Sequence, residues 1–460
     1  MRIRKYDFDY GRRALMEKIV KGSATAGVLT PLWPLVGNAA DIGKAYPDEL
    51  MSIEMQTKGK IKTGDMLTAG NVEHAKHLLD PIVFEQVKSH GRKIKIKATT
   101  RDVSEMYPAP FLEGTLKSQG TAKFGDDGNV YGADGKPFKG GQPFPAPKTA
   151  VEAMTNLAMS WGKGDNRQYA ILETDVGPNG KNSYNYTFCW VELQVNNRTD
   201  GTVFQGRDDL LRHQLVLFTS SQDVAGSSFL STWYYDQRKF PDLYGYLPQF
   251  KRVRQFPTNQ RFEPLIPGVT WFLSDPWAAG DPVQTWGNFR TVERKPMLGG
   301  FSGNWAGQQK NWEKPLHGGA EGVTFMDTEY ELAPEVLVLD MDPTSYSRAP
   351  CSKRRVYVDV RNSMYCGNIR YDRQGNPWVN FEMGSGQFVD GDKAVYEPGT
   401  TSPAWSWTYV MAHDIQNNRM SRGEHCEEIT GGYKTRFDRS SEELYDTFCT
   451  QQALQRLGSV

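Results

Sequence analysis

The feature that most constrains the fold is a series of short β-rich segments that begins near residue 167 and continues almost to the end of the chain. Turn signals separate several of them, including Gly-Pro-Asn-Gly at 177–180 and Asp-Arg-Gln-Gly-Asn at 372–376. The expected strands span 169–176, 184–195, 215–219, 229–236, 252–256, 285–294, 335–341, 354–360, 364–371, 377–383 and 405–412. Parallel strands need long crossover connections, whereas antiparallel strands can be joined by tight turns. We therefore predict a mainly β fold with some α-helix, built on a large antiparallel meander and not on a parallel α/β sheet.

The composition agrees with this fold class. The 460 residues include 45 Gly and 26 Pro, which suit tight turns, and 12 Trp and 21 Tyr, which suit pleated surfaces and grooves for apolar ligands. The formal net charge is zero, but the first forty residues hold seven Lys or Arg and three Asp or Glu. The remaining 47 basic and 51 acidic residues leave a net charge near −4, which argues against a nucleic-acid-binding surface. After residue 40 there is no run of about 18 apolar residues, so we expect no membrane span there.

The first 40 residues resemble a twin-arginine export signal. Arg12 and Arg13 lie in a charged segment, a mildly apolar stretch follows at 19–36, and the small residues at 37–40 suit a signal peptidase. The alternative is a cytosolic amphipathic arm in which the arginines are adjacent by chance. We expect residues 1–40 to be a signal peptide and residues 41–460 to be a single domain, soluble in the periplasm without a lipid anchor.

The five cysteines do not show the Cys-x-x-Cys spacing of a redox or zinc site. Cys189 lies in an apolar, strand-like run, so we expect it to be a free thiol. One or two disulfides are expected among the other four after export, and their pairing is left open. These four are Cys351, Cys366, Cys426 and Cys449.

Helix start signals predict helices at 71–89, at 149–161 and near the C-terminus. Asn71 and Asp80 can cap free backbone amides, and Pro81 suits the first helical position. Residues 149–152 and 440–443 both have the spacing of a capping box. The apolar face of the second helix must pack on another apolar surface, and irregular insertions are expected near 114–147 and 299–323.

Catalytic and metal-binding patterns are sparse. The sequence has no GxSxG, P-loop, HExxH or dinucleotide-binding motif. His74 and His77 could supply two metal ligands, but no third ligand is spaced nearby. We predict no catalytic residues, no metal and no cofactor. A hydrolase or isomerase that uses His413, His425 or Cys426 is the less favoured alternative.

Two sets of residues are candidates for binding an apolar molecule with a charged end. Arg252 and Arg254 share one face of an expected strand and could hold an anionic head group by bidentate contacts. A hydrophobic groove could be formed by Met154, Leu157, Trp161, Trp190, Trp233, Tyr235, Tyr357, Trp378 and Phe381. The alternatives are a solvated outer strand face for the arginines and ordinary core packing for the apolar side chains.

Two motifs resemble those of a bacterial periplasmic family of unknown function in the outer-membrane lipoprotein-sorting (LolA/LolB-like) superfamily. The first comprises 233–235, 246–248, 251–254 and Pro257, and the second comprises 354–359, 371–372, Gly375 and Trp378. The likeness spans most of residues 41–460. It implies an open, strongly curved antiparallel sheet, in effect a half-barrel, that wraps around short helices. The helices expected at 71–89 and 149–161 would then cover its concave side. The export signal and the insertion near 299–323 are departures from the family pattern.

The resemblance also implies a function and partners. Members of the family are often encoded beside an outer-membrane β-barrel and an inner-membrane permease, which implies transport of a hydrophobic compound between them. We therefore predict a non-enzymatic periplasmic carrier for a hydrophobic or lipid-like molecule, without a nucleic-acid partner. The alternative from another class is an interaction subunit of such a system that holds no ligand.

Overall fold

The structure is a computed structural model that describes residues 42–257, 261–275, 281–300 and 303–458. The expected signal peptide, with Arg12 and Arg13, lies outside the described residues. Among the helices that are described, none combines the length and apolar character needed to cross a membrane.

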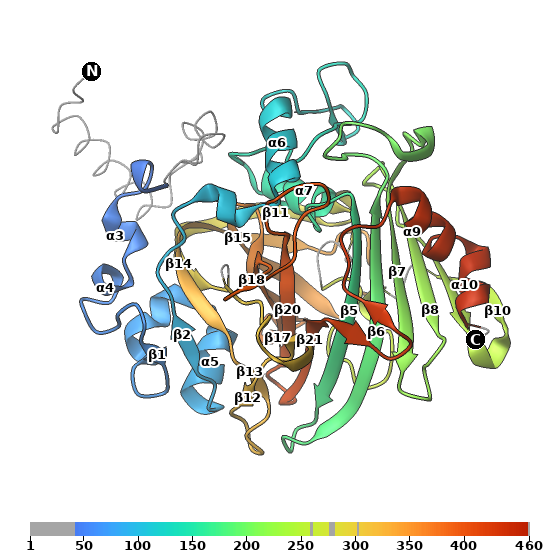
Figure 1. Cartoon of the computed structure of the whole chain (residues 1–460). Coiled ribbons are helices and arrows are strands. Elements are labelled where there is room, and N and C mark those ends of the chain that lie inside the picture. The colour runs from blue at the N-terminus through green and yellow to red at the C-terminus, as the bar shows by residue number, and fades with distance from the viewer. Residues whose placement is uncertain (1–41, 258–260, 276–280, 301–302, 459–460) are drawn as a thin grey trace.

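Most of the strands belong to one sheet (Figure 1). Its strands are β1 (Met66–Leu67), β2 (Ile94–Ile96), β5 (Asn166–Val176), β6 (Asn182–Gln194), β7 (Leu210–Ser220), β8 (Ser228–Tyr234), β9 (Asp242–Leu247), β10 (Arg252–Phe256), β11 (Gly287–Gly299), β14 (Glu329–Asp342), β15 (Cys351–Asp359), β16 (Tyr365–Asp372), β17 (Pro377–Gln387), β20 (Trp405–Asp414) and β21 (Arg419–Cys426). Four two-stranded pairs lie outside it: β3 (Lys123–Phe124) with β4 (Val130–Tyr131), β12 (Leu316–His317) with β13 (Phe325–Met326), β18 (Val389–Asp390) with β19 (Lys393–Ala394), and β22 (Glu428–Ile429) with β23 (Tyr433–Lys434).

The strand order is β1-β2-β14-β15-β16-β17-β20-β21-β5-β6-β7-β8-β9-β10, and β11 pairs with β14. After forming the edge strands β1 and β2, the chain continues at β5 near the middle of the sheet and runs outward to β10. It then crosses to β11 near the other end and returns through β14 to β21, which pairs with β5. Apart from the parallel contact of β2 with β14, the pairs in this sheet are antiparallel. The prediction of a mainly β fold with a large, curved, unclosed antiparallel sheet is confirmed.

The register divides the sheet into two faces, because directly paired residues point to the same side. Phe381 pairs with Ala412, Ala412 with Ser421, and Ser421 with Asp175. We call the side that these four residues share the inner face. The opposite side, the outer face, carries the alternating residues in between, such as Ala170 between its partners on β6 and β21.

Short helices cover both faces. They are α3 (Asp48–Met51), α4 (Ile53–Gln56), α5 (Pro81–Ser89), α6 (Ala109–Ser118), α7 (Ala150–Met159), α9 (Ser441–Phe448) and α10 (Gln451–Gly458). The capping box of Thr149 and Glu152 starts α7 as predicted, and Met154 and Leu157 of α7 are fully buried in the core on the inner side. Leu444 of α9 and Leu454 of α10 pack against the outer face.

The expectation that residues 71–89 cover the concave side together with 149–161 is wrong. The amide of Gln86 on α5 lies 3.2 Å from the ring of His413, whose strand partner is Asn380, next to the inner-face residue Phe381. Alternation places His413 and Asn380 on the outer face, so α5 lies on the side opposite α7. Asp80 does cap α5 as predicted. Sequence alone could not choose the face, because an amphipathic helix fits either side of a sheet that is apolar on both.

The 71–79 segment also differs from expectation in its helix type. Residues Val72–Leu78 form a 3-10 helix, and the Asn71 side chain accepts a hydrogen bond from the Thr68 amide instead of capping the helix. The terminal helix starts as predicted, because the hydroxyl of Ser440 accepts a hydrogen bond from the Glu443 amide.

All five cysteines are buried free thiols, so the expected disulfides do not form here. Cys189 and Cys426 are both partners of Ala170 and therefore flank it on neighbouring strands. Two strand spacings separate them by about 9.5 Å, which exceeds the Cα separation of a disulfide. Cys449 packs into the same outer-face core, whereas the remaining two, on β15 and β16, belong to a different cluster.

The crossing from β10 to β11 brings one segment over the inner face. We call its described residues 261–275 the strap. The hydroxyl of Thr270 donates to the carbonyl of Ala412 at 2.8 Å, and the indole N–H of Trp271 donates to Glu173 at 2.9 Å. Because these two partners lie on β20 and β5, the strap passes over the middle of the sheet.

Candidate functional site

A small apolar cavity lies between the strap and the inner face, and we call it the aromatic cavity. Its volume is about 30 Å³. Strands β5, β6, β17, β20 and β21, the residues after α7, and the strap all contribute to its wall. The lining residues are Trp161, Ile171, Glu173, Phe188, Trp190, Trp271, Phe381, Trp407, Val410 and Gly423.

Strand alternation explains why aromatic side chains converge there. Phe188 and Trp190 are two residues apart on β6 and face the same side, opposite Ile171 and Tyr169 of β5. Trp271 closes the cavity from the strap side. The lining is therefore shared by strands of the sheet and by two segments outside it, the strap and the residues after α7.

Glu173 is the ionisable residue of this lining. It is 1 % exposed, and its carboxylate accepts the hydrogen bond from Trp271. Burial, with a further contribution from nearby Asp175, raises its pKa well above the ordinary value. Burial therefore disfavours a negative charge on this part of the cavity wall.

The strap is fixed at its end by a buried ionic cluster. One carboxylate oxygen of Asp275 lies 2.9 Å from Arg354 on β15, and the other lies 2.6 Å from Arg370 on β16. All three side chains are at most 1 % exposed. The Arg354 and Arg370 backbones are directly paired, so both guanidinium groups reach the strap from the inner face.

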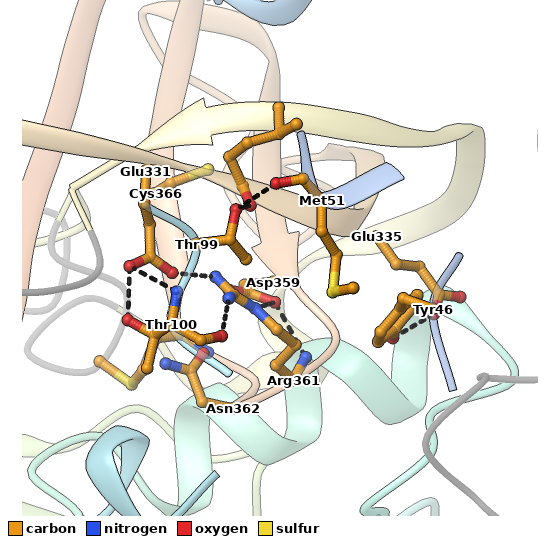
Figure 2. Close-up of polar contacts among 12 residues, drawn as sticks. Tyr46, Met51, Thr99, Thr100, Glu331, Glu335, Asp359, Arg361, Asn362 and Cys366 are labelled. Carbon is orange, nitrogen blue, oxygen red and sulfur yellow. Dashed lines mark hydrogen bonds and ion pairs between the residues drawn. The ribbon is translucent and has the colours of Figure 1, made fainter. Parts of the chain in front are cut away.

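A second buried cluster ties the N-terminal segment to the sheet (Figure 2). The guanidinium of Arg361 lies 2.7 Å from both Glu331 and Asp359, and the Thr100 hydroxyl donates to Glu331 at 2.6 Å. The Tyr46 hydroxyl donates to a neighbouring carboxylate, Glu335, at 2.6 Å. Because these acids are matched by donors, we interpret this cluster as structural support for the sheet.

Three of the residues proposed from the sequence for the hydrophobic groove line the aromatic cavity. They are Trp161, Trp190 and Phe381. Met154 and Leu157 lie in the surrounding core. Trp378 lies outside the cavity, where its ring packs under the Arg370 guanidinium, 4.3 Å from the ring centroid.

Other proposed residues are placed elsewhere. Tyr357 pairs with Gly367 and alternates with inner-face Val356, so it faces the outer side. Trp233 and Tyr235 belong to a separate cluster, in which the Tyr235 hydroxyl accepts a hydrogen bond from the Phe138 amide at 2.7 Å. These two residues therefore fix the 114–147 region.

Arg252 and Arg254 lie on β10 and are exposed. The Arg254 guanidinium stacks on Phe250, 4.2 Å from the ring centroid. Because β10 is four strands from β6 in the sheet order, these arginines are roughly 19 Å from the β6 side of the aromatic cavity.

Comparison with known proteins places the chain in a family. The model of the proteins of unknown function called DUF1329 matches residues 66–455. The chain belongs to the DUF1329 family. No curated protein matches it significantly.

Several solved structures are similar to parts of this DUF1329 chain. A domain from Vibrio parahaemolyticus described as an outer membrane lipoprotein-sorting protein shares 15 % identity with a TM-score of 0.41, covering 67 % of this chain and 99 % of its own. A DUF1329 protein from Desulfovibrio piger has 12 % identity and a TM-score of 0.42, with coverages of 66 % and 97 %. A LolA superfamily protein from Nitrosomonas europaea has 12 % identity and a TM-score of 0.34, with coverages of 65 % and 97 %. The match to the family model over residues 66–455 confirms the resemblance to a family of unknown function that was inferred from the two sequence motifs.

The histidine and cysteine residues of the enzymatic alternative do not converge in this DUF1329 structure. His425 and Cys426 are consecutive on β21 and point to opposite faces. His413 pairs with Met420, six residues or about 20 Å along the strand from Cys426. Burial lowers the pKa of His413 to about 4 and that of His425 well below its usual value. This arrangement provides no nucleophile and base pair.

Sequence reasoning missed several lining residues of this DUF1329 cavity, above all Trp271 and Trp407. Trp407 lies in the expected strand 405–412, where a β-bulge at Thr408, opposite Gly384 and Ser385 of β17, shifts the alternation. Trp271 lies in a segment without periodicity. The available signal was the composition around it, because the run Val269-Thr270-Trp271-Phe272-Leu273 is too apolar for an exposed loop. Its four apolar side chains are indeed buried.

Proposed function

We propose that this protein is a periplasmic carrier for a hydrophobic or lipid-like molecule and that the aromatic cavity is where the apolar part of that molecule binds. The observation that carries the proposal is the convergence of four tryptophans on one cavity between a rigid sheet and a separate strap. Apolar, aromatic-lined cavities are the usual form of small-molecule sites. The indole N–H groups of Trp161 and Trp407 are buried and have no acceptor among the described residues, which suits a lining that a bound molecule completes.

The strap is the element that must move for such a molecule to enter. A cavity of about 30 Å³ holds little more than a water molecule. Displacing Trp271 would join this volume to the space that the strap occupies. We therefore interpret the described conformation as the closed form, with an inner-membrane permease and an outer-membrane β-barrel as the proposed partners in loading and release.

The small cavity volume also favours one second candidate, an interaction subunit that holds no ligand. If the protein's own side chains always fill the inner face, the protein could act only by binding partner proteins through its outer surfaces. The two candidates differ in whether the purified protein contains an extractable apolar molecule.

The test is mass spectrometry of organic extracts from protein isolated from the periplasm, together with a cavity-filling variant. Gly423→Leu adds a side chain at a position where a Cβ would lie 3.2 Å from Val410, so it should reduce the bound molecule severalfold. Met420→Leu, which places the same residue on the outer face of the same strand with little change in side-chain volume, should not. A wild-type protein that is empty and takes up no 1-dodecanol in vitro would favour the interaction subunit instead.

The proposed location has its own test. Replacing Arg12 and Arg13 by lysine should retain the protein in the cytoplasmic fraction, because twin-arginine export depends on that pair. Unchanged periplasmic recovery of the double variant would contradict this export route.

A further inference from the structure

A second hollow lies on the inner side at the start of β5, and we call it the cationic pocket. Its volume is about 240 Å³. It lies between the residues that follow α7, the start of α6 and the loops near 198 and 398. The lining residues are Pro108, Pro110, Lys163, Gly164, Asp165, Asn166, Arg167, Arg198, Thr199, Glu397, Pro398, Phe437 and Arg439.

The lining has four cationic side chains, a lysine and three arginines, and two acidic ones. Arg167 is paired with Glu397 at 2.9 Å, and both are buried. Arg198 lies 3.1 Å from Asp200, and Arg439 lies 2.7 Å from Glu443 on α9. Each arginine therefore has its own carboxylate.

Lys163 differs from the three arginines. It is 2 % exposed, and none of the described carboxylates or carbonyls forms an ion pair or hydrogen bond with its ammonium. Its nearest defined partners are the rings of Tyr107 and Phe111, whose centroids lie 4.8 and 4.7 Å from Nζ. A buried charge is normally paired, so an anion is the missing complement of this site.

The backbone conformation of Lys163 is also unusual for a lysine. Lys163 has φ of 48° and stands between two glycines, Gly162 and Gly164. A left-handed conformation is uncommon for a side chain such as lysine and is often retained at binding sites. Two further donors at the pocket, the Nε–H groups of Arg167 and Arg439, are buried without an acceptor among the described residues.

The cationic pocket and the aromatic cavity are linked by the same two elements. Trp161 lines the cavity and Lys163, two residues later, lines the pocket. On β5, Arg167 lines the pocket and Ile171 lines the cavity, with Tyr169 between them on the same face. Four strand residues span about 13 Å, which is a suitable separation for the two ends of one elongated molecule.

We propose that the cationic pocket binds the anionic head group, a carboxylate or a phosphate, of an amphiphile whose apolar tail lies along the inner face toward the aromatic cavity. This inference rests on the proposed carrier function and specifies its ligand class. Lys163 supplies the charge that the head group neutralises, and the paired arginines hold the pocket open around it. The exposed Arg252 and Arg254 are then not needed for head-group binding.

Calorimetric titration of the full mature chain with four probes tests this inference. The probes are dodecanoate, dodecyl phosphate, uncharged 1-dodecanol and inorganic phosphate, each below its aggregation concentration. Both long-chain anions should bind at least tenfold more tightly than 1-dodecanol, because a charge-assisted contact replaces an unpaired buried cation. Lys163→Met should remove this preference by lowering the affinity for both long-chain anions at least tenfold. Lys136→Met, at an exposed lysine in the 114–147 region, is the matched control and should keep the preference.

The outcomes separate this inference from the carrier proposal. Equal affinity for 1-dodecanol and the two anions, or unchanged anion binding by Lys163→Met, overturns the head-group site but leaves the carrier intact. Inorganic phosphate that binds as tightly as dodecyl phosphate also overturns it, because the pocket would then bind anions without a tail. If no long-chain probe binds, the carrier proposal itself fails. Lys163→Gln, which keeps a polar side chain, provides the same comparison if the methionine variant does not fold.

Discussion

The buried carboxylate at the end of the strap gives the sharpest stability prediction. Asp275→Asn keeps the shape of the side chain but removes the negative charge between Arg354 and Arg370, which lie 2.9 and 2.6 Å from its oxygens. Removing one partner of a buried ion pair leaves an uncompensated charge and typically costs about 3–5 kcal/mol. We expect a loss in that range, with the strap as the element that loosens first.

An exposed pair of the same chemistry provides the control. Asp342 lies 2.9 Å from Arg290, and the two side chains are 29 % and 47 % exposed. Because solvent screens such a pair, Asp342→Asn should cost less than about 1 kcal/mol. A second substitution, Arg370→Met in the Asp275→Asn protein, should recover part of the lost stability, because it removes one of the two arginine charges that Asp275 had paired with.

Urea unfolding followed by tryptophan fluorescence and by circular dichroism measures these differences, provided that the two transitions coincide. Binding of a hydrophobic dye under native conditions reports strap loosening separately. Equal losses for Asp275→Asn and Asp342→Asn would refute the reasoning, because burial would then make no difference. A loss without added dye binding would retain the ion-pair argument but contradict the role of Asp275 in holding the strap over the sheet.

Two further predictions concern buried ionisable groups. Burial lowers the pKa of Lys163 from 10.5 to about 7. Between these two pH values the unfolded chain binds a proton that the folded chain does not, so the penalty on folding grows as the pH falls and is fully present below about 7. Lys163→Met should therefore raise the free energy of unfolding at pH 6 by about 2–4 kcal/mol, a figure that allows for the lost contacts with the two rings. This gain should shrink as the pH rises toward 10. A gain that does not change with pH in urea titrations would contradict this. Glu173 has the opposite sign, because its raised pKa makes the wild type lose stability as pH rises above the carboxyl's ordinary value of 4.5. Glu173→Gln should reduce this loss of stability, measured as the thermal midpoint from pH 4 to 8. Part of the loss will remain, because the pKa of Asp175 is also raised, to about 6. Parallel curves for the wild type and the variant would exclude Glu173 as a cause.

Local sequence signals were sufficient where one interaction decides the structure. The capping box at Thr149 and Glu152 and the Asp80-Pro81 start place α7 and α5 correctly, because a cap is a contact between residues close in sequence. The glycine turn at 177–180 likewise lies where expected, since Gly180 adopts a φ of 80°.

β21 shows why other parts could not be found. Its sequence, Arg-Met-Ser-Arg-Gly-Glu-His-Cys, has no apolar alternation, yet it is a central strand paired on both sides. Its charged residues are buried because distant segments supply partners: the Lys314 amide donates to Glu424 at 2.7 Å, and the Arg422 guanidinium donates to the Thr324 carbonyl at 3.0 Å. Such long-range compensation overrides local propensity and leaves no local trace.

Only part of the candidate site could be predicted from the sequence, for the same reason. Residues 154–161 and 190 pointed to an apolar site because they follow helix and strand periodicity. Lys163 and Trp271 follow neither, since one lies in a left-handed turn and the other in the strap. Trp271 reaches the cavity only because the strap crosses the sheet, and Lys163 gains its ring contacts with Tyr107 and Phe111 from a segment more than fifty residues earlier in the chain.

The position of the strap in the chain links closure to the architecture of the sheet. Because β10 and β11 lie near opposite ends of the sheet order, the connection between them must cross it, and the described part crosses the inner face. A connection over the outer face would meet α9 and α10, whose leucines already cover β6 and its neighbours. The strap is therefore a consequence of the strand order, and its polar anchors, Glu173 and Asp275, are the groups that can tune how readily it opens. The ion pairs of Asp275 with Arg354 and Arg370 make part of this hold depend on charge, which apolar packing of the strap alone would not do.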